Sequence, residues 1–166
     1  MQGAYFLDFG VMDTLVAIGK LLVALACGAV IGWEREVHEK AAGLRTHMLV
    51  SAGSCLFAIV GLEVQSAFPG DDILRVVQGI IMGMGFLAGG VIFREGASVR
   101  GLTTAAGLWV LAAVGLTVGL GSFLLAFAAT LLSFITISVL ARVEKKAKAH
   151  AAASHQRDDP PPAPEH

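Results

Sequence analysis

The stretch LTTAAGLWVLAAVGLTVGLGSFLLAFAATLLSFITISVLA, residues 102–141, decides the fold because it contains no Asp, Glu, Lys or Arg. A helix needs about 20 apolar residues to cross a hydrocarbon core about 30 Å thick, so a single helix over this stretch would be too long. The apolar pattern weakens only at Gly119, Gly121 and Ser122. We therefore predict two membrane-spanning helices, residues 102–120 and 122–141, separated by a tight turn.

Three earlier stretches have the same character: residues 14–33, 45–64 and 73–93. Over the whole chain 55% of the residues are hydrophobic and 15% are charged, and the mean hydropathy is +0.73. Soluble domains carry about 25% charged residues. The apolar runs are continuous, whereas a membrane β-barrel would alternate apolar and polar residues. The sequence thus predicts an all-α, polytopic transmembrane bundle of about five helices.

Basic residues lie at every second connection of this bundle. They are Arg35, Lys40 and Arg45 in the first, Arg94 and Arg100 in the third, and Arg142, Lys145, Lys146 and Lys148 after the last helix. The segment before the first helix carries only Asp8 and Asp13. The positive-inside rule then predicts an N-terminus outside the membrane and a C-terminus in the cytoplasm.

We expect the chain to divide into two parts. Residues 1–141 form the transmembrane domain, and residues 142–166 form a cytoplasmic tail that is first basic and then rich in proline. The run Pro160–Pro162 cannot continue a helix. The composition from Ala149 onward is typical of a disordered segment.

Small residues recur every four positions in three of the predicted helices: Ala24, Gly28 and Gly32; Gly79 with Gly83 and Gly85 with Gly89; Gly115 with Gly119. This spacing lets helix backbones approach closely in lipid. We expect these faces to pack within the chain, with a homo-oligomer interface as the alternative.

Two segments also resemble each other. Val30-Ile-Gly-Trp-Glu-Arg-Glu36 followed by Gly43-Leu-Arg-Thr46 matches Val91-Ile-Phe-Arg-Glu95 followed by Gly101-Leu-Thr-Thr104. Each is an apolar helix end, an Arg/Glu cluster and a Gly-Leu entry into the next helix. This pattern indicates a parallel repeat of two helical hairpins plus a fifth helix, although chance similarity is the alternative.

Charged and polar side chains concentrate in the two connections predicted to be cytoplasmic. The candidate functional cluster there consists of Glu34, Arg35, Glu36, Arg45, Thr46, His47, Arg94, Glu95, Arg100, Thr103 and Thr104. Because both signs of charge are present, the cluster allows two kinds of site.

The carboxylates of this cluster, together with Glu39, could hold Mg²⁺, which prefers oxygen ligands. The helix starts at Leu44–His47 and Leu102–Thr104 present free N–H groups and could instead hold an anion such as phosphate. A structural interpretation has threonine hydroxyls cap both helices while the charges form salt bridges.

Three polar residues lie near the opposite side of the predicted membrane: Lys20, Glu63 and Gln78. An intramembrane charge usually finds a partner, so we hypothesise that Lys20 pairs with Glu63. The alternative is that Lys20 extends outward to the membrane surface. We predict no enzyme activity and no resident cofactor, because the sequence contains none of the common catalytic or phosphate-loop motifs. Nor does it contain a basic stripe for nucleic acid.

Four linked runs resemble the MgtC/SapB family of bacterial membrane proteins. They are Gly28-Ala-Val-Ile-Gly-Trp-Glu-Arg-Glu36, Ala42-Gly-Leu-Arg-Thr-His47, Gly85-Phe-Leu-Ala-Gly-Gly-Val-Ile-Phe-Arg-Glu95 and Val99-Arg-Gly-Leu-Thr-Thr-Ala-Ala-Gly-Leu-Trp109. The resemblance covers residues 13–141 and implies a bacterial inner-membrane protein of four or five helices. Longer members of the family carry a cytoplasmic C-terminal domain, where this sequence has only its proline-rich tail, and the roles of that domain, including virulence, are therefore not expected.

The resemblance also implies a link to growth at low Mg²⁺, and it suggests the F-type ATP synthase as a partner complex. We therefore expect a regulatory membrane protein linked to magnesium and ion homeostasis. The alternative is a small Mg²⁺ transporter or channel whose pathway lies between the hairpin repeats.

Overall fold

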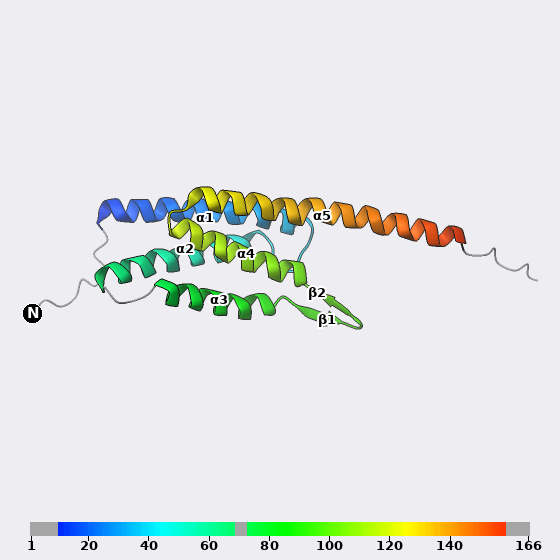
Figure 1. Cartoon of the computed structure of the whole chain (residues 1–166), viewed down its shortest axis with the longest axis horizontal. Helices are drawn as coiled ribbons and strands as arrows, with labels where there is room; N and C mark the ends of the chain where they lie inside the picture. Colours follow the sequence, from blue (N-terminus) through cyan, green and yellow to red (C-terminus); the bar gives the residue numbers. More distant parts are fainter. Residues whose placement is uncertain (1–9, 69–72, 159–166) are drawn as a thin grey trace, which may run out of the picture.

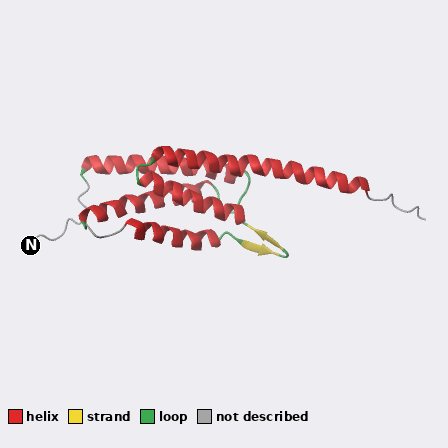
Figure 2. Cartoon of the chain, in the orientation of Figure 1, coloured by secondary structure: helices red, strands yellow, loops and turns green. Residues whose placement is uncertain are grey.

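The computed structural model describes residues 10–68 and 73–158, and within them the side chains up to Leu140. The elements along this part of the chain are α1 (Val11–Val37), α2 (Leu44–Ala67), α3 (Ile73–Gly89), β1 (Phe93–Glu95), β2 (Ser98–Arg100), α4 (Leu102–Gly119) and α5 (Phe123–Asp158). The helices run alternately up and down in one bundle, with a short strand hairpin at its edge (Figures 1 and 2). The all-α transmembrane prediction is confirmed.

The connections fall at the ends that the charge pattern predicts. The α1–α2 connection and the β1–β2 hairpin lie at the same end of the bundle, and α5 extends beyond that end (Figure 1). We call this the loop end, defined by residues 38–43 and 93–101. The tight turn predicted between the last two spans is also present, because α4 ends at Gly119 and α5 begins at Phe123. Gly121 has φ +85°, a left-handed conformation that favours glycine.

Four of the helices are long and apolar enough to span a membrane: α1, α2, α4 and residues Phe123–Leu140 of α5. α3 has 17 residues, a rise of about 25 Å, so it is shorter than the other four. The expected third span, 73–93, was too long at its C-terminal end. The helix stops at Gly89, and Phe93 already pairs with Arg100 in the antiparallel β1–β2 hairpin.

The segment after the last span also differs from expectation. α5 continues to Asp158, beyond the expected end of the span at residue 141, and residues 149–158 are helical where we expected disorder. This stretch contains no proline, and alanine and lysine are strong helix formers. The proline run Pro160–Pro162 lies outside the described residues.

The core of the bundle is built around α4, which contacts all four other helices. Leu108, Leu111, Val114 and Val118 are at most 1% exposed. Leu111, Val114 and Val118 pack with buried residues of α1, α2 and α5, among them Ile31 and Cys55. The outer faces of the helices remain apolar and exposed, as expected of surfaces that lipid covers.

Glycines bring three of the helices into close contact. A Cβ atom at Gly28 of α1 would lie 2.7 Å from Met48 Cα of α2. A Cβ at Gly115 of α4 would overlap the Ser51 carbonyl oxygen, also on α2. α2 therefore lies between α1 and α4 with almost no side-chain spacing on either side. The predicted packing of small residues within the chain is confirmed for α1 and α4.

The same prediction is wrong for α3. A Cβ atom at Gly79, Gly83, Gly85 or Gly89 would have no heavy atom within 4 Å. The four-residue spacing puts these glycines on the surface of α3, but no neighbouring helix of the described chain packs there.

We predict opposite effects for the same substitution on α4 and α3. Gly115→Ala should lower the free energy of unfolding by about 1–3 kcal/mol, because its Cβ forces α4 away from Ser51. Gly85→Ala should raise it slightly, by about 0.4–1 kcal/mol, because the site is open and alanine lowers the entropy of the unfolded chain. Denaturant titrations of both variants in the same detergent would test this. Equal effects at the two positions would contradict the close α2–α4 contact.

Candidate functional site

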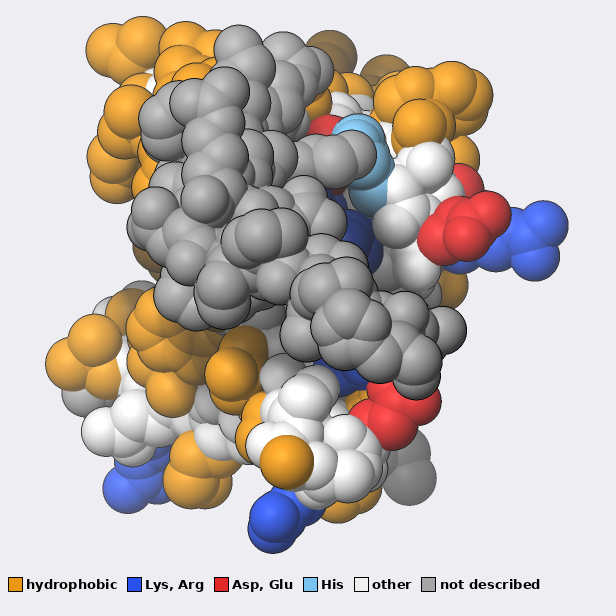
Figure 3. All heavy atoms as spheres, turned by 90° about the vertical axis from the view of Figure 1, so that its right-hand side faces the viewer, with side chains coloured by type: hydrophobic (Ala, Val, Ile, Leu, Met, Phe, Trp, Pro, Cys, Tyr) orange, Lys and Arg blue, Asp and Glu red, His pale blue; other side chains and the backbone are white. Residues whose placement is uncertain are grey.

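Charged side chains gather at the loop end, as the sequence predicts. Figure 3 views the molecule from this end and shows acidic, basic and histidine side chains among the hydrophobic ones. The structure separates the predicted cluster into two parts. One part is a buried corner where α1 turns into α2, and the other is the exposed β1–β2 hairpin.

The buried corner contains an ion pair at the end of α1. Arg35 Nε lies 2.5 Å from Glu34 Oε2, and the two residues are 4% and 9% exposed. His38 donates from Nδ1 to the Glu34 carbonyl oxygen at 2.8 Å, and the same nitrogen lies 3.3 Å from Glu34 Oε1. His38 is not among the residues predicted from the sequence, although its position four residues after Glu34 was the available signal.

The start of α2 is stabilised by a carboxylate of the chain itself. The Leu44 N–H donates to Glu36 Oε2 at 2.9 Å, so a negative charge already lies at the positive end of this helix. The expected phosphate site at Leu44–His47 is therefore filled by Glu36. Thr46 does not cap α2, because the N-cap residue is Gly43. A Cβ atom at Gly43 would overlap the Glu36 carboxylate.

His47 is completely buried beside this corner. Its Nδ1 donates to the Gly43 carbonyl oxygen at 2.8 Å, which leaves Nε2 as the acceptor of the neutral ring. That Nε2 faces Gly107 of α4 and has no hydrogen-bond partner among the described residues. The Ser51 hydroxyl, one turn later on α2, is also buried and also has no hydrogen-bond partner among the described residues. These groups belong to the core, where a histidine between α2 and α4 fills space.

The hairpin carries the exposed part of the cluster. Arg100 Nε lies 2.7 Å from Glu95 Oε2, and both side chains are more than 60% exposed. Arg94 Nε donates to the Gly96 carbonyl oxygen at 2.9 Å. At the following helix start the N-cap is Gly101, with no side-chain cap, so Thr103 does not play the expected capping role.

The remaining predicted residues separate by burial. Thr104 is buried in the bundle, whereas Thr103 and Arg45 are exposed. No ion pair or hydrogen bond of the Arg45 side chain occurs within the described part of the chain. Arg45 is therefore available, near the loop end, to bind another molecule.

The carboxylates fit a Mg²⁺ ion poorly. Glu34 is paired with Arg35, Glu36 accepts a backbone N–H, and Glu95 is paired with Arg100. Across the described side chains, those of residues 10–68 and 73–140, no group of three or more His, Cys, Asp or Glu residues is arranged to hold a metal. A hard cation needs several free oxygen ligands, and these carboxylates already bind other groups of the chain.

The opposite end of the bundle corrects the Lys20–Glu63 hypothesis. Lys20 Nζ donates to the Gly119 carbonyl oxygen at 2.8 Å, at the C-terminus of α4. An ammonium group there satisfies a free carbonyl and complements the negative end of the helix. Glu63 and Lys20 line the same cavity of about 210 Å³, together with Asp13, but form no ion pair. Gln78 is exposed on α3, away from this cavity.

Comparison with known proteins gives a consistent picture. The model of the MgtC family matches residues 21–146. Protein MgtC of Salmonella typhimurium LT2 is 46% identical over 112 residues, which are 68% of this chain and 47% of that protein. The Escherichia coli K12 protein named "Putative magnesium transporter YhiD" is 40% identical over 124 residues, 72% of this chain and 57% of that protein.

The Synechocystis protein slr0014, named as uncharacterized, is 47% identical over 105 residues, 63% of this chain and 43% of that protein. The chain thus spans about half the length of the curated relatives it matches. No solved structure is significantly similar to the chain.

We predict that two Glu→Gln substitutions, each at an Arg-paired carboxylate, differ sharply in cost. Glu34→Gln should lower the free energy of unfolding by about 3–5 kcal/mol, because it leaves Arg35 buried and unpaired. Glu95→Gln should cost at most about 1 kcal/mol, because its pair with Arg100 is exposed. Thermal and denaturant unfolding in one detergent measure both. Similar costs would show that the Glu34–Arg35 pair is not buried.

We also predict that Lys20 acts through α4 and not through Glu63. Lys20→Met should cost about 1.5–3 kcal/mol, since it removes a charged donor from the Gly119 carbonyl. Glu63→Gln should cost little. The free energy of unfolding of the two single variants decides the matter, and Lys40→Met, in the exposed loop, serves as the control. If Glu63→Gln lowers the free energy of unfolding as much as Lys20→Met, the result would instead support an ion pair between Lys20 and Glu63.

Proposed function

The chain belongs to the MgtC family, and from this premise we propose that it is a non-catalytic regulatory membrane protein linked to magnesium and ion homeostasis. It acts by contact with a membrane partner, for which the F-type ATP synthase is our first candidate. Support for the link to magnesium comes from the family and from the name of the Escherichia coli relative. Because the chain spans only part of those relatives, their activities enter here as part of the proposal.

The observation that carries the proposal is the distribution of charge in the bundle. Lys20 and Glu63 lie near one end, and the Glu34–Arg35 pair lies at the other. Between them, Ala24, Cys27 and Leu111 are at most 2% exposed and pack as one apolar cluster. Mg²⁺ gives up its water reluctantly, so a transport path would need polar groups along its length. A tightly packed apolar core fits a protein that works at its surface.

The loop end offers the working surface. The hairpin pair Glu95–Arg100 and the exposed Arg45 and Trp33 all lie there, next to the basic residues of the connections. By the positive-inside rule we place this end in the cytoplasm of a bacterium, with the chain in its inner membrane. A membrane-embedded complex with a cytoplasmic part could contact this surface.

The second candidate function is transport of Mg²⁺ by the chain itself. The name of the Escherichia coli relative favours it. A transporter of this kind would use the carboxylates at the two ends, Glu34 and Glu63, to receive and release the ion. The two candidates differ in whether the protein alone moves Mg²⁺.

Liposomes that contain only this protein separate the two functions. We expect Mg²⁺ entry no faster than in empty liposomes, because the core between the two charged ends is apolar. Entry that is fast and is abolished by Glu63→Gln, a change that should leave the fold intact, would establish transport and overturn the regulatory proposal. A magnesium-sensitive dye inside the vesicles gives the readout.

Cross-linking in native membranes tests the proposed partner. In native membranes, wild-type protein should capture subunits of the F-type ATP synthase, and Arg100→Glu should reduce the yield because it reverses a charge on the exposed hairpin. Arg75→Glu, an exposed arginine on α3 away from the loop end, is the matched control. Equal capture by both variants would exclude the hairpin as the contact surface. Absence of synthase subunits from the wild-type sample would exclude that partner.

A further inference from the structure

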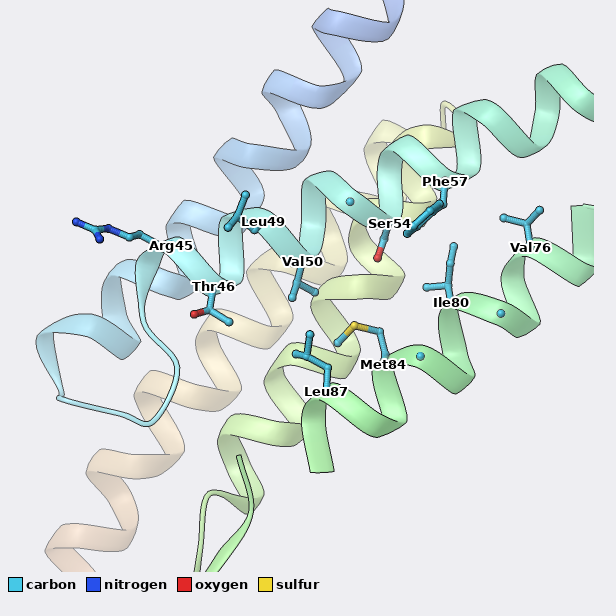
Figure 4. Close-up of a pocket in the computed structure, with 13 residues that line it drawn as sticks. Arg45, Thr46, Leu49, Val50, Ser54, Phe57, Val76, Ile80, Met84 and Leu87 are labelled. Carbon is cyan, nitrogen blue, oxygen red and sulfur yellow. The ribbon is translucent and has the colours of Figure 1, made fainter. Parts of the chain in front are cut away.

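A large groove separates α2 from α3 on the membrane-facing side of the bundle. Its volume is about 770 Å³, and its walls are residues 45–57 of α2 and 76–87 of α3. Figure 4 shows Ile80, Met84 and Leu87 pointing from α3 toward α2, with Val50 pointing back. Met84 and Val50 are buried and form the floor. The groove plays no part in the function proposed above.

Glycines make the groove. Gly53 of α2 and Gly79 and Gly83 of α3 line it, and a Cβ atom at any of them would meet nothing within 4 Å. Farther from the loop end the two helices touch, since a Cβ at Gly61 would lie 2.6 Å from Ile73 Cδ1. The groove is therefore open toward the loop end and closes near Gly61.

The dimensions suit one leaflet of a bilayer. The helical rise from Arg45 to Phe57 is about 18 Å, close to half of a hydrocarbon core about 30 Å thick. A transmembrane helix of another protein would need the whole thickness of the membrane, and the contact at Gly61 interrupts such a path. An occupant that begins at one membrane surface and ends near the midplane fits better.

The position of positive charge in the groove indicates the chemical class of its occupant. Among the described residues that line the groove, Arg45 alone is ionised, and it stands at the open end with its guanidinium directed beyond the helices (Figure 4). Its side chain has no ion pair or hydrogen bond within the described part of the chain. A cation at the mouth of an apolar groove matches a phosphate group joined to an acyl chain.

From these observations we infer that the groove binds one anionic phospholipid of the leaflet at the loop end. One acyl chain lies along Gly53, Gly79 and Gly83, and the headgroup phosphate pairs with Arg45. Burial of the chain alone gives little preference, because the surrounding lipid is equally apolar. Selectivity for an anionic headgroup therefore depends on Arg45, while retention of any lipid depends on the space that the glycines leave.

Native mass spectrometry of the full chain, released from detergent with added lipid, tests the headgroup. Phosphatidylglycerol and phosphatidylcholine with identical acyl chains serve as probes. We expect one phosphatidylglycerol to bind in preference, because a choline ammonium offsets the phosphate charge of phosphatidylcholine. Arg45→Gln should weaken phosphatidylglycerol binding roughly fivefold and phosphatidylcholine binding less, so that the preference is lost. Arg75→Gln, at the other end of α3, should change neither. Equal binding of the two lipids by the wild-type protein would overturn the inference.

A second pair of variants tests the groove itself. Gly83→Leu should fill the space and reduce retention of both lipids, whereas Gly85→Leu, equally open but outside the groove, should not. Because neither leucine meets a neighbouring atom at its Cβ, both variants should fold, and their thermal stability verifies this. Equal lipid retention by the two variants would contradict the groove. So would a protein dimer that Gly83→Leu dissociates, because a second copy would then be the occupant.

Discussion

Direct backbone contact between α2 and its two neighbours is the constraint on which the rest of this structure depends. In lipid the hydrophobic effect gives helices little reason to associate, so close packing must supply the attraction. Gly28 on α1 and Gly115 on α4 allow it, since a methyl group at either position would collide with the backbone of α2. This packing fixes the α1–α2 corner, and with it the positions of Glu34, Arg35 and Glu36.

That corner satisfies its own charges. The Glu36 carboxylate accepts the first N–H of α2, and Glu34 is paired with a buried arginine. Charged groups that could have formed an ion or phosphate site are used to hold one helix against the next. Groups that remain available for other molecules lie outside it, on the β1–β2 hairpin and at Arg45.

Hydropathy and charge alternation predicted the five helices, the turn at Gly121 and the common end of the two loops, because each depends on local composition. Features that depend on distant contacts were missed. Nothing near Lys20 in the sequence indicates the Gly119 carbonyl, 99 residues away. The spacing of Gly79 and Gly83 is the same as that of Gly115 and Gly119, yet only the second pair meets another helix. The β1–β2 hairpin was also missed, because α3 stops at Gly89 although the apolar run of the sequence continues to Phe93.

The shortness of α3 has a consequence for the surrounding bilayer. Its 17 residues rise about 25 Å, several ångströms less than a hydrocarbon core of about 30 Å, while the 24 residues of α2 beside it exceed that thickness. Such hydrophobic mismatch is relieved by local thinning of the membrane or by tilt, at a modest energetic cost for each ångström. The bilayer should therefore be thinnest along one side of this protein, which favours membranes and neighbours of matching thickness on that side.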